Sequence, residues 1–423
     1  MKKRYKNMQG ITLVVLVVTI IILLILAGIS ISSLKNTGIF EKTQEAKEKM
    51  ENAELDEQKL LTEYEKNLNE NIAEKMTEDK INKVLSKETN TIVKDENENI
   101  IVVPAGFKII VNDTTNNATT VDKGIVIEDA TVNEDGSKTA TNGSQFVWVP
   151  IGNIKKEDGT DITINLGRYY FKSETGEEIP TEGSEGIEED RGNKKTELLN
   201  YGNVISKNLS EFKESVLKNG GYYIGRYEAR TNVERTAYTE PLTQITEKKE
   251  DNVYNLVTQP QAAKLAQNMY NSANFTSDLI NSYAWETTIL FIQKFTAQTK
   301  YAYQASLNKE FLAKGTDNDI ECNIYDIASN VWEWTTETTT SSNTPCIGRG
   351  GSYYYDFFSS ITRNSGYTNG TAEHVGFRPI LYLKEIKKHK KTFSVKYELQ
   401  KSTKYFCVFF DMFALTKKQN MIK

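Results

Sequence analysis

The stretch that decides the fold lies between residues 323 and 379, and its three parts read NIYDIASNVWEWT at 323–335, IGRGGSYYY at 347–355 and RNSGYTNGTAEHVGFRP at 363–379. Trp332 and Trp334 alternate with Glu333. In an extended strand both indoles therefore point to one side and the carboxylate to the other. Two large aromatic side chains on one face anchor a core. We expect a strand here with one buried face.

Two carboxylates flank the beginning of this strand. Asp326 precedes a turn at 328–330, and Glu333 follows it. A turn followed by a strand can aim two carboxylates and the intervening carbonyls at one point, and such oxygen ligands suit Ca²⁺. The local pattern fits an exposed Glu and an ordinary turn Asp better than a calcium site, so both interpretations stay open at this level.

The paired glycines after Arg349 indicate a backbone that needs positive φ or close approach just before a strand. The apolar run 380–383 is typical of a closing strand. Together the segments SNVWEWT, RGGS and GFR resemble, in order and separation, those of the formylglycine-generating enzyme (sulfatase-modifying factor) family. The resemblance implies an α+β, C-type-lectin-like fold that is rich in loops. The family's motif residues correspond to Trp332, Trp334, Arg349, Gly350, Gly351, Gly376, Phe377 and Arg378.

The resemblance extends upstream of these motifs. Phe146–Pro150 is similar to the opening strand of the family, and Gly220–Ala229 is similar to a later strand. Residues 260–270 and 281–292 are expected to be helices, the first with a proline near its start. We therefore assign residues 146–384 to a domain of this family.

The catalytic members of the family carry, shortly after RGGS, two cysteines that bind copper and activate oxygen. Here the segment 352–360 has no cysteine, and Cys346 lies before the motif. A related branch of the family binds iron through histidines. The two histidines of this chain are His374, expected in a surface loop, and His389 in the tail, and they cannot form such an iron site. The resemblance therefore predicts no copper, no iron and no catalytic residues, and it favours a non-catalytic binding module. An oxidoreductase of the formylglycine-generating type is the disfavoured alternative.

In lectin-like folds the ligand surface is formed by loops near the C-terminal strands, which here means residues 353–367. Tyr and Phe give contact area at low entropic cost, and Ser and Asn adapt their hydrogen bonds. About half of these rings are expected in the core instead. The segment also resembles the variable proteins of diversity-generating retroelements, which diversify positions between RGGS and GFR. The candidate ligand-binding residues are Tyr353, Tyr354, Tyr355, Asp356, Phe357, Asn364 and Tyr367.

The family resemblance also bears on calcium. Matched residue by residue, the family's calcium site falls on the side chains of Asp326 and Glu333 and on the carbonyls of Ser329 and Val331. The resemblance therefore favours a structural Ca²⁺ over the simpler interpretation of these two carboxylates.

The N-terminus is basic over residues 1–10 and uncharged over residues 11–34. The apolar run is about long enough to span a bilayer, and the preceding charges predict a cytoplasmic N-terminus with the rest outside. A cleaved secretion signal is the alternative. The segment resembles a type IV prepilin, which implies cleavage after Gly10 and methylation of Ile11. Val15 stands where the family usually has the Glu used in pilus assembly, which leaves a minor or tip subunit or a plain membrane anchor open.

The remaining segments are assigned by composition and pattern. Residues 35–97 are expected to form a helical stalk with a second short helix at 77–87, residues 98–145 a small β segment, and residues 385–423 a basic and aromatic tail without assigned function. The 423-residue chain has a net charge of −5, which argues against nucleic acid as a partner. Its three cysteines do not suggest a disulfide framework.

These observations predict a single-pass protein of a bacterial cell membrane that displays an extracellular binding module for an unknown protein or glycan. Other pilin-like subunits are candidate partners. A structural minor pilin or pseudopilin is the main alternative.

Overall fold

The computed structural model describes residues 73–111, 118–181, 195–196, 200–201, 204–205, 209–316, 318–339, 343–355 and 357–384. The expected leader, transmembrane segment and tail lie outside these residues, as do Gly10, Ile11 and most of the expected stalk. Within the described ranges, no helix has the length and apolar character needed to cross a membrane. The prepilin-like N-terminus therefore stays a prediction.

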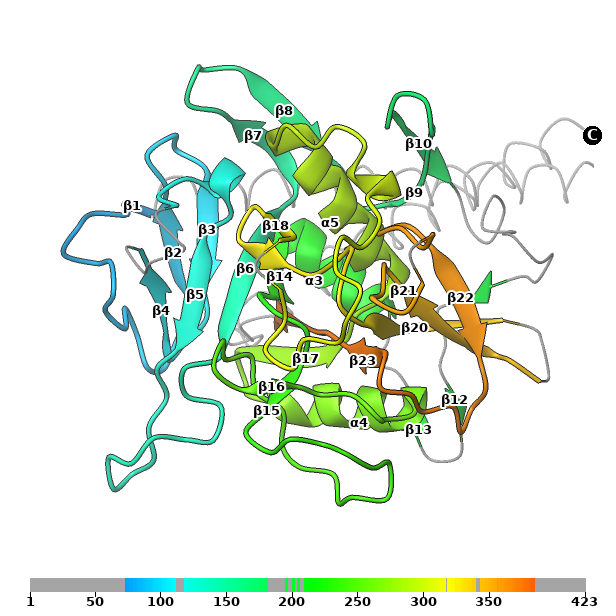
Figure 1. Ribbon diagram of the computed structural model, residues 1–423. Helices are drawn as coiled ribbons and strands as arrows, with labels where there is room; N and C mark the ends of the chain where they lie inside the picture. Colours follow the sequence, from blue (N-terminus) through cyan, green and yellow to red (C-terminus); the bar gives the residue numbers. More distant parts are fainter. Residues whose placement is uncertain are drawn as a thin grey trace, which may run out of the picture. The chain divides into compact units, whose positions relative to one another are not determined.

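A six-stranded antiparallel sheet forms the centre of the domain, in the order β17-β24-β14-β6-β5-β4 (Figure 1). Its strands are rich in branched and aromatic residues, and nearly all of these side chains are buried. The closing strand β24 is confirmed, and it lies between β14 and β17. The strands are β4 (Phe107–Ile110), β5 (Val126–Asp129), β6 (Gln145–Pro150), β14 (Gly221–Gly225), β17 (Phe275–Leu279) and β24 (Pro379–Leu383).

The expected small β segment and the expected main domain share this sheet, because β5 pairs directly with β6. Residues 73–97, expected to continue the helical stalk, instead contain β1 (Glu74–Lys75) and β2 (Thr91–Lys94). The second short helix expected at 77–87 is wrong. Asn82 there adopts a φ of 62°, which ends the first turn, and its N–H donates to the carbonyl of Ile109 at 2.7 Å instead of continuing a helix.

The three sequence motifs come together in a second, five-stranded sheet in which β20 lies at the centre. Trp332 at the beginning of β20 pairs with Val375 of β23 in parallel, and Glu333 pairs with Arg349 of β21 in antiparallel orientation. The expected Trp-Glu-Trp strand is confirmed. The strands are β11 (Lys195–Thr196), β20 (Trp332–Thr339), β21 (Cys346–Arg349), β22 (Arg363–Gly366) and β23 (Val375–Phe377).

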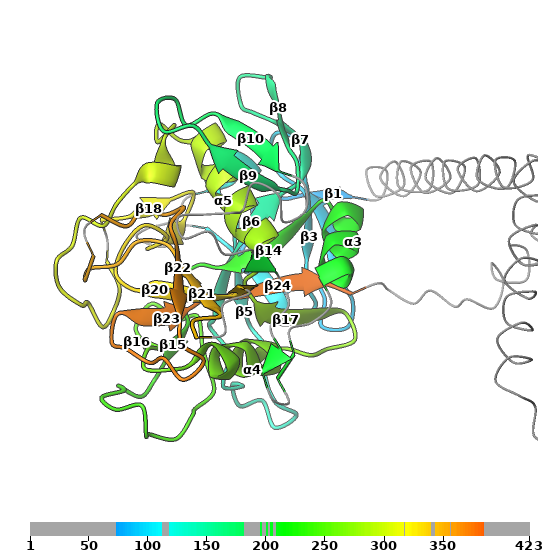
Figure 2. The same ribbon diagram turned by 90° about the vertical axis from the view of Figure 1, so that its right-hand side faces the viewer.

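Two helices connect the sheets, and both were predicted from the sequence. Helix α4 (Gln259–Met269) begins with a capping box at Thr258 and contacts β17 and β20. Helix α5 (Ser282–Phe295) begins at the N-cap Asn281 and contacts β6 and β20. Figure 2 shows α5 above and α4 below the strands of the central sheet, with α3 (Leu209–Asn219) packed on β14 and β24.

The rest of the described chain consists of short strands and loops, as the resemblance implied. These elements are β3 (Ile100–Val103), β7 (Gly152–Lys155), β8 (Asp161–Ile164), β9 (Arg168–Phe171), β10 (Glu178–Thr181), β12 (Asn200–Tyr201), β13 (Val204–Ile205), β15 (Arg230–Thr231), β16 (Asn252–Val253), β18 (Ile320–Glu321) and β19 (Ile324–Tyr325), with 3₁₀ turns η1 (Val121–Lys123) and η2 (Tyr301–Tyr303).

Candidate functional site

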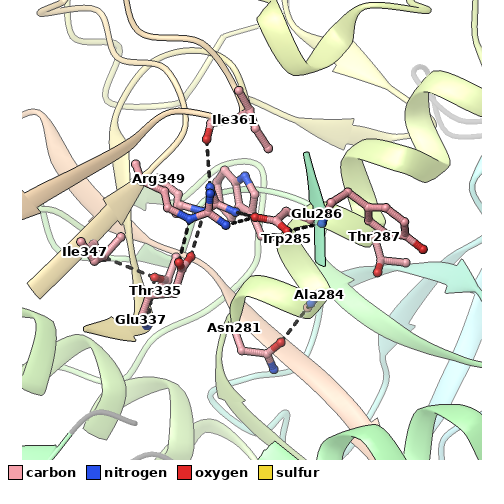
Figure 3. Close-up of polar contacts among 12 residues, drawn as sticks. Asn281, Ala284, Trp285, Glu286, Thr287, Thr335, Glu337, Ile347, Arg349 and Ile361 are labelled. Carbon is pink, nitrogen blue, oxygen red and sulfur yellow. Dashed lines mark hydrogen bonds and ion pairs between the residues drawn. The ribbon is translucent and has the colours of Figure 1, made fainter. Parts of the chain in front are cut away.

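The arginine of the RGGS motif lies in a fully buried ionic cluster (Figure 3). Its guanidinium contacts Glu286 of α5 at 2.6 Å and Glu337 of β20 at 2.9 Å, and it donates to the carbonyl of Ile361 at 2.9 Å. Arg363 of β22 joins the same two carboxylates, with its Nε 2.8 Å from Glu337. We call these four charged side chains the ionic cluster. Because it joins β20, β21, β22 and α5, it fixes the strands that border the following loop.

The glycines after Arg349 allow the chain to press against a neighbouring loop. Gly350 has a φ of 88°, in the region that favours glycine. A Cβ on Gly351 would lie 1.9 Å from the carbonyl oxygen of Ala328, which leaves no room for any side chain. The expected positive φ and close approach are confirmed, but their expected place just before a strand is wrong, because the glycines follow β21 and lead into a loop. The segment that begins at Ser352 therefore leaves the core at a fixed position.

The arginine of the GFR motif holds Glu333. Its Nε lies 3.0 and 3.1 Å from the two oxygens of Glu333, and its other nitrogens donate to the carbonyls of Gly225 and Tyr325 at 3.0 and 2.8 Å. Glu333 is buried, so an exposed glutamate at this position is excluded. Burial raises the pKa of the Glu333 carboxyl to about 7, although the charge of Arg378 acts in the opposite direction.

Asp326 is also buried and has protein donors of its own. It accepts from the N–H and hydroxyl of Thr316 at 2.9 and 2.5 Å and from the hydroxyl of Ser329 at 2.7 Å. Burial raises its pKa, against these hydrogen bonds. Its backbone has a φ of 62°, which supports the expected turn before β20.

The carboxylate oxygens of Asp326 thus accept hydrogen bonds from Thr316 and Ser329. Those of Glu333 accept hydrogen bonds from the Arg378 guanidinium. The N–H of Val331 meanwhile donates to Glu228 at 3.0 Å. Among the described residues, no group of three or more carboxylates, imidazoles and thiols is arranged to hold a metal ion. Calcium binding by Asp326, Glu333 and the carbonyls of Ser329 and Val331 needs these contacts to rearrange, and it stays a prediction.

The residues after Ser352 form a group of aromatic rings that we call the aromatic surface: Tyr353, Tyr354, Tyr355, Phe357 and Phe358. Tyr355 is at its centre, with ring centroids 4.7 Å from Tyr354, 5.7 Å from Phe357 and 5.0 Å from Phe358. Tyr355 and Phe358 pack on Trp332 at 5.3 and 4.8 Å. The structure therefore brings together four of the predicted ligand-binding residues and supports them on the first tryptophan of β20.

Exposure divides this group into two parts. Tyr353, Tyr355 and Phe358 are half-buried, and Tyr355 and Phe358 pack against the core without being enclosed in it. The expectation that about half of the rings would fill the core is therefore met only in part. Tyr354 is 59% exposed and Phe357 is 71% exposed. Both rings contact Tyr355, and two large exposed aromatic side chains around one half-buried ring are typical of a binding surface.

The other predicted ligand-binding residues differ in position. Asn364 lies half-exposed on β22, while Tyr367 is 60% exposed and makes no ring contact with the aromatic surface among the described residues. Asp356 lies outside the described residues.

The sequence did not predict the role of His374. This residue lies just before β23 and was expected in a surface loop, but it is half-buried and stacks on Tyr354, with centroids 4.6 Å apart and planes at 13°. The N–H of Trp332 donates to the carbonyl of His374 at 2.8 Å, which fixes the imidazole beside the rings. Burial lowers the pKa of His374, although Glu373 opposes the shift. Parallel pairing of β20 with β23 creates this contact, and no local sequence pattern signals it.

The described thiols lie outside the segment in which the catalytic members have their cysteine pair. Cys346 is buried in β21, ahead of Arg349, and Cys322 lies in the turn before β19. Burial raises the pKa of the Cys322 thiol, and nearby carboxylates add to the shift. A thiol with a raised pKa is a weak nucleophile at neutral pH.

A comparison with models of known protein families gives a match to this chain. Residues 201–382 match the model of the Sulfatase-modifying factor enzyme 1-like domain. The chain carries a sulfatase-modifying factor enzyme 1-like domain. The match includes all three motifs, the ionic cluster and the aromatic surface.

Among solved structures, the chain has a similarity to Treponema denticola variable protein 1, with 12% identity and a TM-score of 0.31 over 57% of this chain and 97% of that one. No curated protein matches the chain.

Proposed function

We propose that the sulfatase-modifying factor enzyme 1-like domain is a non-catalytic module that binds an extracellular ligand on the aromatic surface. The observation that carries this proposal is the exposure of Tyr354 and Phe357 next to half-buried rings that hold them. Exposed apolar patches of this kind mark interaction sites. Rings fixed before binding lose little conformational entropy when a ligand arrives, which favours affinity.

The placement of the ionisable side chains supports a structural role for them and not a catalytic one. Arg349 and Arg363 are paired with Glu286 and Glu337 in the core, and Arg378 is paired with Glu333. A general acid, base or nucleophile has to reach a substrate. These groups instead hold strands together below the aromatic surface, so we assign catalysis to none of them.

We further propose that residues 11–34 anchor the protein in the cell membrane with residues 1–10 in the cytoplasm. The support is the uncharged run of residues 11–34 behind a basic segment. Cleavage after Gly10 and methylation of Ile11 belong to this proposal, as does contact with other pilin-like subunits. The same N-terminus is the specific observation for a second candidate function, a structural minor pilin or pseudopilin.

The binding function is tested with the full-length protein in detergent or proteoliposomes, applied to arrays of glycans and cell-surface proteins. The decisive variant is Tyr354→Ala/Phe357→Ala, and Tyr238→Ala, which removes a 64% exposed tyrosine elsewhere, is the matched control. We expect a specific signal that the double variant loses and the control keeps. If the folded protein gives no signal, or the double variant keeps it, the structural-subunit function becomes the better account.

The anchor is tested by mass spectrometry of the N-terminus of protein taken from cell membranes. We expect a mature chain that begins with methylated Ile11. An intact leader on membrane-bound protein would exclude processing, and recovery of the protein without residues 11–34 would exclude the anchor.

A further inference from the structure

The strands that end the two sheets differ in how their outer edges are covered. In the central sheet, the outer edge of β4 is covered by the chain before it, because the N–H of Asn82 donates to the carbonyl of Ile109 at 2.7 Å. The outer edge of β17 is closed in the same way, since the N–H of Ser277 donates to the carbonyl of Tyr270 at 3.1 Å. The protein therefore pairs both edges of this sheet with its own main chain.

In the five-stranded sheet, β23 is also covered and β22 is not. The N–H of Ala229 donates to the carbonyl of Phe377 in β23 at 2.8 Å. Strand β22 pairs with β21 along one side, and over the ranges that the structure describes no strand pairs with its other side. Figure 1 shows β22 beside β21 at the end of the sheet. This arrangement leaves β22 as an edge to which a further strand can be added.

The register shows which main-chain groups of β22 point outward. The N–H of Gly350 donates to the carbonyl of Thr362 at 3.2 Å, just before β22 begins. Hydrogen-bonded and non-hydrogen-bonded pairs alternate along antiparallel strands, so the pair of Ile347 with Ser365, an odd number of positions further along, is non-hydrogen-bonded. The N–H and C=O of Ser365 therefore point away from β21. Neither group makes a hydrogen bond to another residue that the structure describes.

Strand β22 lacks the features with which proteins protect sheet edges, such as proline, bulges and exposed lysines. It reads Arg-Asn-Ser-Gly, and its pairing with β21 runs without a register shift. Its one charged side chain, Arg363, is buried in the ionic cluster. Asn364, Ser365 and Gly366 are half-exposed. The side chains of β22 itself therefore do not prevent another strand from pairing with it.

The ionic cluster also holds this edge in place. Arg363 contacts Glu286 of α5 and Glu337 of β20. Because these side chains are buried, β22 keeps its extended form before a partner arrives, and less conformational entropy is lost on binding.

We propose that β22 binds an extended polypeptide segment of a partner protein, which pairs with its outer edge as an additional strand. An N–H and a C=O that point outward from an extended strand are complementary to a second extended main chain. The edge has four residues, so pairing with β22 of a second copy would bury little area for a stable dimer. A segment of a partner protein can add contacts of its own side chains on both faces of the sheet. The inference goes beyond the proposed ligand site on the aromatic surface and does not depend on it.

The test uses the full-length protein in detergent to select binders from a library of short linear peptides of random sequence. We expect linear peptides that bind, as measured by calorimetry, and that slow hydrogen exchange of the Ser365 amide. Methylation of the bound peptide's main-chain nitrogens, one at a time, should weaken binding about tenfold or more at every second position, because alternate N–H groups face β22.

Ser365→Pro is the decisive variant. It removes the outward N–H without breaking a hydrogen bond to β21, and proline is accepted on edge strands at such positions. We expect it to weaken peptide binding about tenfold or more and to keep the melting temperature within about 3 °C of the wild type. Ser365→Ala keeps the N–H and is the matched control, with binding expected within about threefold. The methylated peptides test the same contact on the wild-type protein should Ser365→Pro not fold.

Several results would overturn the inference. Absence of any bound linear peptide, equal binding to Ser365→Pro, or tolerance of methylation at every position would each do so. Slow exchange of the Ser365 amide before peptide is added would show that the protein's own chain covers the edge, and concentration-dependent dimerisation that Ser365→Pro abolishes would show a second copy there instead. Loss of peptide binding in Tyr354→Ala/Phe357→Ala, with Ser365→Pro unaffected, would assign the peptide to the aromatic surface and so support the binding function alone.

Discussion

Replacement of Arg349 by methionine tests the claim that the ionic cluster holds the base of the aromatic surface. Arg349 has no exposed side-chain area and contacts Glu286, Glu337 and the carbonyl of Ile361. Methionine replaces the aliphatic part of the side chain but removes the guanidinium. Glu286 and Glu337 then lose one of the two arginines with which they pair, and the Ile361 carbonyl loses a donor.

The size of the effect follows from burial of these groups. Loss of one partner from a buried ion pair typically costs about 3–5 kcal/mol, because a charge stays in the core without compensation. This is a large part of an ordinary domain's stability of about 5–15 kcal/mol. At roughly 2–4 °C per kcal/mol for a domain of more than 150 residues, we expect the melting temperature to fall by about 10 °C.

The assay is thermal and denaturant unfolding of the full-length protein followed by circular dichroism. Lys172→Met is the matched control, because the Lys172–Glu177 pair at 2.7 Å is 41% and 57% exposed and should change stability by less than about 1 kcal/mol. Adding Glu337→Gln to Arg349→Met restores charge balance, so the double variant should lose about 1–3 kcal/mol less than the sum of the singles. A loss below about 1 kcal/mol for Arg349→Met, or additive effects, would refute the reasoning.

Three further predictions concern Glu333, Gly351 and the buried Asp319, which accepts hydrogen bonds from the Tyr301 hydroxyl and the Ala328 N–H. Glu333→Gln leaves Arg378 without its anionic partner, so we expect a loss of about 3 kcal/mol or more in denaturant unfolding; an unchanged midpoint would show that the pair is not structural. Burial raises the pKa of Asp319 to about 7 from an ordinary value of 3.8, and Asp326 adds to the shift. Its neutral form therefore stabilises the fold below pH 4, and that contribution is lost between pH 4 and 7, at up to about 1.4 kcal/mol per pH unit. Asp319→Asn should flatten the stability profile in that window, and an unchanged slope would assign the pH dependence to other groups. Gly351→Ala places a Cβ 1.9 Å from a backbone oxygen, so we expect little soluble protein; wild-type yield and melting temperature would contradict the close approach.

Local sequence patterns predicted the elements that depend on neighbouring residues. The alternation of Trp332, Glu333 and Trp334 predicted the strand and the burial of both indoles, because side-chain direction in a strand follows a period of two. The expectation of only one buried face was wrong, because Glu333 on the opposite face is also buried, where it pairs with Arg378. The glycines after Arg349 predicted the close approach, because few other residues permit it.

Local sequence patterns could not predict the contacts between segments that lie far apart in the chain. Arg349 meets Glu286 from a helix more than sixty residues earlier, and the stack of His374 on Tyr354 depends on the parallel pairing of β23 with β20. The pairing of β5 with β6 across the predicted boundary between the β segment and the main domain is another contact between separate segments that no local pattern signals. Asn82, which ends a turn through positive φ, shows that one residue's conformation can override a helical pattern.

The central claim is that the exposed rings of the aromatic surface serve binding and not folding, and the Tyr354→Ala/Phe357→Ala variant of the full-length protein tests it most directly. We predict a melting temperature within about 3 °C of the wild type, because both residues are more than half exposed, together with loss of the ligand found on the arrays. Retained binding in the stable variant, or unfolding of the variant with no ligand found for the wild type, would contradict the account.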